Sequence, residues 1–82
     1  MQIIMLNAAD FYYLPRIKNL EREFQKCSAK FNQLDREYRE YLELSNPSIA
    51  HLNILASQLE TVVELMEAIS NQIKRLKLEF CN

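Results

Sequence analysis

The sequence predicts an all-α fold, an antiparallel two-helix hairpin that packs like a coiled coil. Three observations predict it. Apolar or aromatic residues recur at alternating steps of three and four over residues 13–41 and again over residues 52–80, a spacing that places them on one face of each helix. A break containing a proline, residues 45–48, separates the two stretches. The two series also mirror each other about this break, so that the numbers of paired residues add up to 93.

The mirrored residues form the predicted seam between the helices. Folding the chain at the break sets Tyr41 beside Leu52 and Phe31 beside Val62, and one fold-back therefore buries both apolar stripes against each other. The first series is Tyr13, Ile17, Leu20, Phe24, Cys27, Phe31, Leu34, Tyr38 and Tyr41, and the second is Leu52, Leu55, Leu59, Val62, Met66, Ile69, Ile73, Leu76 and Phe80.

Residues 1–14 are predicted to form an apolar N-terminal arm. Proline is favoured in the first turn of a helix and disrupts its interior, so the first long helix is expected to begin at Pro15. Asn7 could also cap a short helix, and an alternative start of the long helix at Asn7 would place a kink at Pro15. The aromatic cluster of residues 11–14 gives this segment more apolar surface than a free tail needs.

The proline in the break explains why the helix is interrupted there. Proline pushes the preceding residue out of the α region, so Asn46 is expected to cap the second helix and Pro47 to occupy its first position. The remaining positions of the first helix are mostly charged or polar, as expected for a solvated face. The predicted hairpin spans residues 15–82 and comprises a helix over 15–44, a turn over 45–48 and a helix over 47–80.

The second helix carries another stripe beside its seam, and none of its residues is charged. A single antiparallel neighbour covers the seam and only part of this stripe, while the other flank adds Ile49, Ala56 and Val63. Two interpretations stay open: these residues pack against the hairpin edge or the folded-back arm, or they bind a partner protein. The candidate partner-binding residues are Ile54, Gln58, Thr61, Leu65, Ala68 and Gln72.

Composition argues against several classes of function. The 82 residues suffice for one small domain, and ten basic residues are interleaved with eleven acidic ones, without the basic face of a nucleic-acid binder. The chain has no glycine, and therefore no glycine-rich phosphate loop. Its single histidine, His51, lacks the companion ligands of a zinc site. We therefore expect no enzyme activity, no catalytic residue, no metal or other cofactor, and no small-molecule substrate.

The compartment is expected to be cytoplasmic. The sequence has no run of eighteen apolar residues, the length that would predict a membrane span. Its apolar start lacks the basic region of a secretory signal. The mirror places Cys27 opposite Met66 and Cys81 near Tyr12, far beyond the reach of a disulfide. Cys27 is then a small seam residue and Cys81 a thiol near the chain end, as expected in a reducing compartment.

The hairpin resembles a known family, the small helical-hairpin co-chaperones of type III secretion needle subunits. The resemblance covers roughly residues 15–80 and lies in the length, the hairpin and the run from Leu59 to Val63 that continues through Ala68-Ile69. The apolar segment before Pro15 differs from the short polar start of that family. The resemblance implies a cytosolic protein that pairs with a second, helical-repeat chaperone and holds the needle subunit before export.

Two functions of different classes follow. The first is an adaptor or co-chaperone that buries its uncharged stripe against a heterologous helical partner. The second is a structural homodimer, in which two hairpins pair these stripes into a four-helix bundle or coiled-coil scaffold. A single long helix in a parallel coiled coil is disfavoured, because Asn46-Pro47 would lie in its middle.

Overall fold

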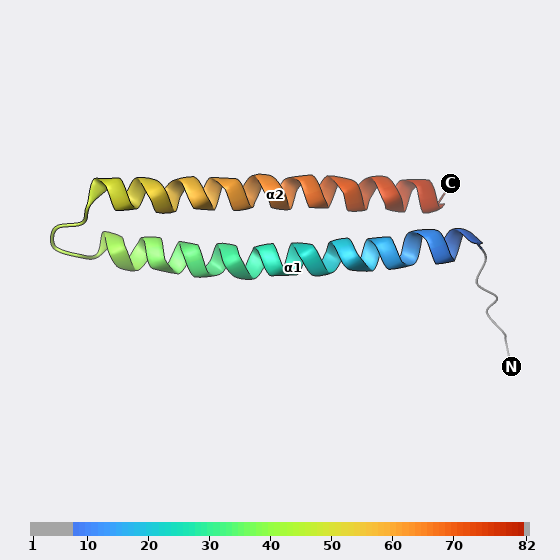
Figure 1. The fold of residues 1–82 in the computed structure, drawn as a ribbon, viewed down its shortest axis with the longest axis horizontal. Helices are drawn as coiled ribbons and strands as arrows, with labels where there is room; N and C mark the ends of the chain where they lie inside the picture. Colours follow the sequence, from blue (N-terminus) through green and yellow to red (C-terminus); the bar gives the residue numbers. More distant parts are fainter. Residues whose placement is uncertain (1–7, 82) are drawn as a thin grey trace, which may run out of the picture.

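The chain folds back on itself once, as two long antiparallel helices. The computed structural model describes residues 8–81, in which helix α1 (Ala8–Leu42) is followed by helix α2 (Ile49–Cys81). Figure 1 shows the helices side by side along their length, with the short connection at one end and the start of α1 beside the end of α2 at the other. The predicted all-α antiparallel hairpin is confirmed.

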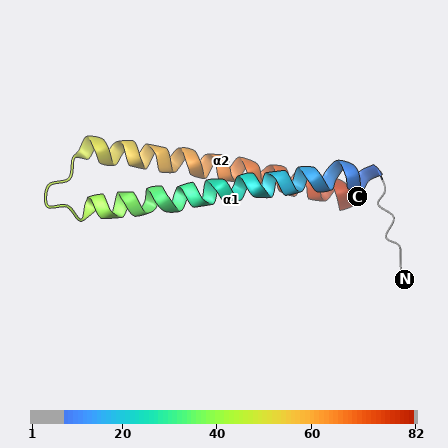
Figure 2. The ribbon, with the colours of Figure 1, turned by 60° about the horizontal axis from the view of Figure 1, so that its bottom comes forward.

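The hairpin is a single layer of helices. Its Cα atoms span 65 × 25 × 12 Å, and the smallest dimension corresponds to about one helix diameter. In Figure 2 the helices lie apart near the turn and overlap toward their other ends, so they are not strictly parallel. Because each helix has only one neighbour, both broad faces of the layer are open to solvent.

The predicted seam forms the contact between the two helices. Every residue of both mirrored series is buried or half-buried. The rings of Tyr13 and Phe80 lie 5.7 Å apart between centroids, which is the pairing that the mirror predicts for these two positions. Side chains more than nine-tenths buried are few because two helices cannot enclose a seam: Ile17, Leu34, Leu55 and Ile69.

Helix α1 begins at Ala8, so the predicted start at Pro15 is wrong. Pro15 lies inside the helix, where it lacks the N–H that would bond to the carbonyl of Phe11 and where its ring crowds that carbonyl. Packing across the seam offsets this cost, because Tyr13, before the proline, stacks against Phe80 of α2. The predicted arm of residues 1–14 is helical from Ala8 onward, and the alternative start at Asn7 lies outside the described residues.

Arg16 supports the backbone next to the proline. Its Nη1 donates a hydrogen bond to the carbonyl oxygen of Tyr12 at 2.7 Å, and its guanidinium lies 3.9 Å from the centroid of the Tyr12 ring. Tyr12 in turn meets Tyr13 edge-to-face, with 4.8 Å between ring centroids. The aromatic cluster seen in the sequence is therefore part of the helix rather than of a separate arm.

The end of α1 is tighter than an α-helix. The amide of Glu43 donates to the carbonyl of Glu40, and that of Leu44 to the carbonyl of Tyr41, both at 3.2 Å. These bonds span three residues, a common way for the last turn to satisfy carbonyls that lack a helical partner. The helix ends at Leu42, two residues before the predicted Leu44.

Ser48 caps helix α2, so the prediction of Asn46 as the cap and Pro47 as the first helical residue is wrong. The Ser48 hydroxyl oxygen accepts a hydrogen bond from the amide of His51 at 3.4 Å, the amide that an N-cap side chain normally satisfies. The Ser48 carbonyl accepts the first helical bond from Leu52 at 3.0 Å. Helix α2 therefore begins at Ile49, two residues later than predicted.

Candidate protein-interaction surface

The α2 stripe is the set of six uncharged residues beside the seam, and all six are exposed: Ile54, Gln58, Thr61, Leu65, Ala68 and Gln72. Ile54 and Leu65 leave 55% and 50% of their surface accessible. The hydroxyl of Thr61 donates to the Ser57 carbonyl at 3.0 Å, so its hydrogen-bonding need is met within the helix. The predicted stripe thus exists as a continuous exposed surface, and the hairpin does not cover it.

The α2 stripe shares one broad face of the layer with an edge of α1. A shallow groove of about 270 Å³ is lined by Lys30 from α1 and by Gln58 and Thr61 from α2. A second groove of about 200 Å³ brings Leu20 of α1 beside Gln72. We call this side the stripe face.

The α1 edge of the stripe face is charged. Residues seven apart return to nearly the same side of a helix, so the positions one and two heptads from Lys30 accompany it on this edge. Glu37 lines a groove with Leu44 and His51, and His51 lies one heptad before Gln58 of the stripe, on the same side of α2. The residues of this charged row are Arg16, Glu23, Lys30 and Glu37, and all of them are exposed.

The stripe face ends at the turn in a polar and aromatic cluster. The ring centroids of Tyr41 and His51 lie 4.3 Å apart, and the Tyr41 hydroxyl oxygen accepts a hydrogen bond from the Ser48 amide at 3.4 Å. His51 is exposed. Its packing against Tyr41 was not predicted, because this contact crosses the turn.

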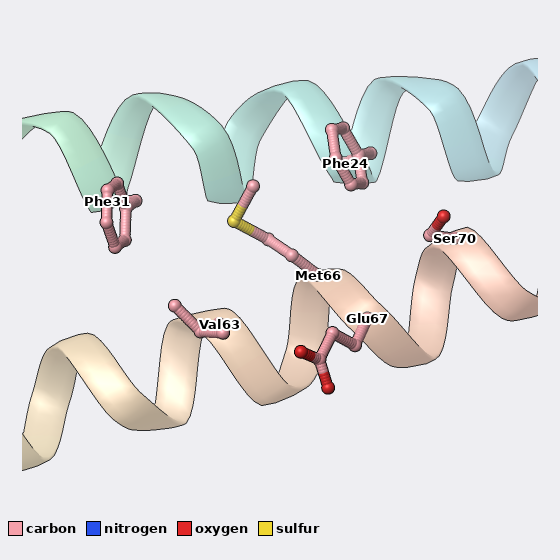
Figure 3. Close-up of a pocket in the computed structure, with 6 residues that line it drawn as sticks. All are labelled: Phe24, Phe31, Val63, Met66, Glu67 and Ser70. Carbon is pink, nitrogen blue, oxygen red and sulfur yellow. The ribbon is translucent and has the colours of Figure 1, made fainter.

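The opposite face holds an apolar groove that the sequence pattern did not reveal. Its volume is about 330 Å³, and its apolar walls are Phe24 and Phe31 from α1 and Val63 and Met66 from α2. Figure 3 shows the Met66 side chain reaching between the two phenylalanines, while the carboxylate of Glu67 points away from α1. A thioether beside aromatic rings is a favourable contact.

The groove shows that the seam is open. Phe24, Phe31 and Met66 belong to the predicted seam, yet each is only half-buried. The flanking residues Ile49 and Val63 are exposed on α2. The spacing of Phe24 and Phe31 gives no signal of this opening, since both occupy ordinary seam positions.

At the end of the hairpin away from the turn, Tyr13 contacts Glu79. Partial burial is the main cause that raises the pKa of the Tyr13 phenol, and the negative charge of the hydrogen-bonded Glu79 carboxylate and the neighbouring Tyr12 raise it further. All of these effects favour the neutral phenol. This contact joins the first turns of α1 to the last turn of α2, where the seam ends.

The described residues contain few groups suited to chemistry. In residues 8–81, no three or more His, Cys, Asp or Glu side chains come together as metal ligands do, and no polar or charged side chain of that range is buried. Cys27 is half-buried and Cys81 exposed, both as free thiols. Neither α1 nor α2 is long and apolar enough to cross a membrane.

Comparisons with known protein families, with curated proteins and with solved structures found no match. The two broad faces of the hairpin are therefore its candidate functional surfaces. On the stripe face, the six residues of the α2 stripe extend over nineteen positions of α2.

Proposed function

We propose that this chain is a protein–protein interaction module that binds a helical partner through the α2 stripe. The observation that carries the proposal is that six residues in heptad spacing are all uncharged and all exposed. Burying the accessible surface of Ile54 or Leu65 would contribute roughly 2 kcal/mol each, at about 25 cal/mol per Å². A helix that packs its own apolar side chains between them would gain this free energy.

The hairpin resembles the co-chaperones of type III secretion needle subunits, and this favours a more specific proposal. In it, the chain is a cytoplasmic co-chaperone that pairs with a second, helical-repeat chaperone and helps to hold a needle subunit before export. A thin hairpin with few fully buried residues fits such a role, because a partner that binds only the folded state adds to its stability.

Substitutions on and off the α2 stripe test the proposal. Leu65→Glu and Ala68→Glu place a charge on the stripe and should abolish partner binding while leaving helicity unchanged. Leu78→Glu is the matched control, because Leu78 is 67% exposed and lies on α2 outside both the seam and the stripe. It should bind as the parent does.

The measurement is calorimetric titration of the purified chain with candidate helical-repeat chaperones, alone and with the needle subunit, with circular dichroism recorded on each variant. Binding of the parent and of Leu78→Glu, together with loss for both stripe variants, would support the proposal. Equal binding by Leu65→Glu, Ala68→Glu and the parent would show that the stripe is not the interface.

A further inference from the structure

We infer that in the free protein the stripe face is covered by a second copy of the chain, in one antiparallel register set by the charged row. This inference rests on the proposed function in one respect, since it places the second copy on the stripe that a heterologous partner would use. The partner would then have to displace it. The order of charges along α1 identifies a second copy of the chain as the molecule that covers the stripe face.

The charged row alternates in sign at every heptad: Arg16 is positive, Glu23 negative, Lys30 positive and Glu37 negative. Read in the opposite direction, the row carries the opposite sign at each position, so two such rows placed antiparallel are complementary in charge. If two copies stack by their stripe faces with α1 antiparallel to α1, Arg16 lies opposite Glu37 of the second copy and Glu23 opposite Lys30. A two-fold axis repeats both pairs, giving four pairs of opposite charge.

The same register arranges the α2 stripes. Residues directly across the hairpin have numbers that add up to 93, as the contact between Tyr13 and Phe80 confirms. Pairing Glu23 with Lys30 therefore sets Leu65 opposite Ala68 of the second copy, and the axis repeats that contact. A large side chain then faces a small one, which is how two helix surfaces interdigitate.

The register also makes the two hairpins overlap almost completely. Its axis crosses α1 between residues 26 and 27, close to the middle of the helix that runs from Ala8 to Leu42. Two helices side by side, about 20 Å wide and about 48 Å long in the overlap, bury roughly 950 Å² on each copy. The total of roughly 1,900 Å² lies within the range of stable interfaces.

The alternative stacking is less favourable. If the two-fold axis ran along the helices, α1 would lie on α2 of the second copy, and Lys30 would face Leu65 and Thr61. Charged side chains would then be buried against apolar ones without partners. In the antiparallel register, Lys26 lies near Lys26 of the second copy at the axis. The Lys26 Nζ lies 3.5 Å from the Glu23 carboxylate of its own chain, and this carboxylate offsets the lysine's charge.

The experiment is light scattering coupled to size-exclusion chromatography, over protein concentrations from about 5 to about 200 μM, a range that brackets a micromolar Kd. The parent should form a dimer. Glu23→Lys and Lys30→Glu should each weaken it by about tenfold or more, because opposite charges become like charges at two symmetric positions. Arg36→Glu makes the same kind of charge change at an exposed α1 position outside the row and should leave the dimer unchanged.

An equimolar mixture of Glu23→Lys and Lys30→Glu gives the sharpest result, because it restores opposite charges in a heterodimer. The double variant E23K/K30E should likewise restore its own dimer. A monomeric parent at every concentration overturns the inference, as does a dimer that responds to Arg36→Glu as strongly as to the row variants. If the parent is monomeric but still binds a helical partner that Leu65→Glu loses, the second copy is excluded and the proposed function stands.

Discussion

Truncation of Leu34 to alanine tests whether the seam holds the hairpin together. Leu34 is 3% exposed, the lowest value among the buried residues. Leu34→Ala removes three carbon atoms, worth about 0.8 kcal/mol each on transfer from water. A shallow groove beside Leu34 is open to solvent, so only a small cavity cost is added. We expect a loss of about 2.5–3.5 kcal/mol in the free energy of unfolding, within the range for such truncations.

The assay is urea denaturation followed by circular dichroism, at one fixed protein concentration because self-association would shift the midpoint. Leu78→Ala is the matched control, since Leu78 is 67% exposed on α2, and it should change the free energy of unfolding by less than about 0.5 kcal/mol. Surface substitutions usually change the free energy of unfolding by up to about 0.5 kcal/mol. If the free energies of unfolding of Leu34→Ala and Leu78→Ala differ by less than this, the seam does not stabilise the fold as described.

Three further predictions concern the ends of the helices. Pro15→Ala should raise the free energy of unfolding by about 1–3 kcal/mol, because it restores a backbone hydrogen bond inside α1; in a helix that began at this residue, the change would be neutral or destabilising. Tyr41→Phe should cost about 0.5–1 kcal/mol and speed amide exchange at Ser48, which loses its acceptor; unchanged exchange would argue against this bond. The raised pKa of Tyr13 should contribute stability that is complete below pH 10.0, the value for an unperturbed tyrosine, and that is lost as pH rises through the raised pKa. In urea titrations over this range, Glu79→Gln should lose less stability than the parent, and equal losses would contradict the assignment.

The seam and its register could be predicted from the sequence because they depend on local spacing. Residues three and four apart share a helix face whatever the rest of the chain does, and the mirror about the break fixed which faces meet. The positions of the α2 stripe followed from the same spacing, and their exposure agrees with a surface that one neighbouring helix cannot cover.

The helix ends could not be predicted in the same way. At Pro15 the local preference for a helix start is outweighed by a long-range contact, the packing of Tyr13 on Phe80. At the turn, Asn46 and Ser48 are both good capping residues, and only the position of the Ser48 hydroxyl relative to the His51 amide distinguishes them.

The apolar groove depends on how side chains of the two helices interdigitate. Phe24 and Phe31 read as ordinary seam residues, and nothing in their spacing reveals that Met66 reaches between them and leaves the seam open on that side (Figure 3). The charged row, unlike the apolar groove, is visible in the sequence. Its alternation is present in the sequence, but its meaning depends on knowing which face of the hairpin it shares with the α2 stripe.

The most direct test of the central claim, that a second copy of the chain docks on the α2 stripe, compares the mass in solution of the parent, Leu65→Glu and Leu78→Glu. We predict that the parent and Leu78→Glu move from the 9.8 kDa of one chain toward twice that mass as concentration rises. Leu65→Glu should stay at the mass of one chain with the same helicity. If Leu65→Glu and the parent have the same mass at every concentration, docking of a second copy on the α2 stripe is contradicted.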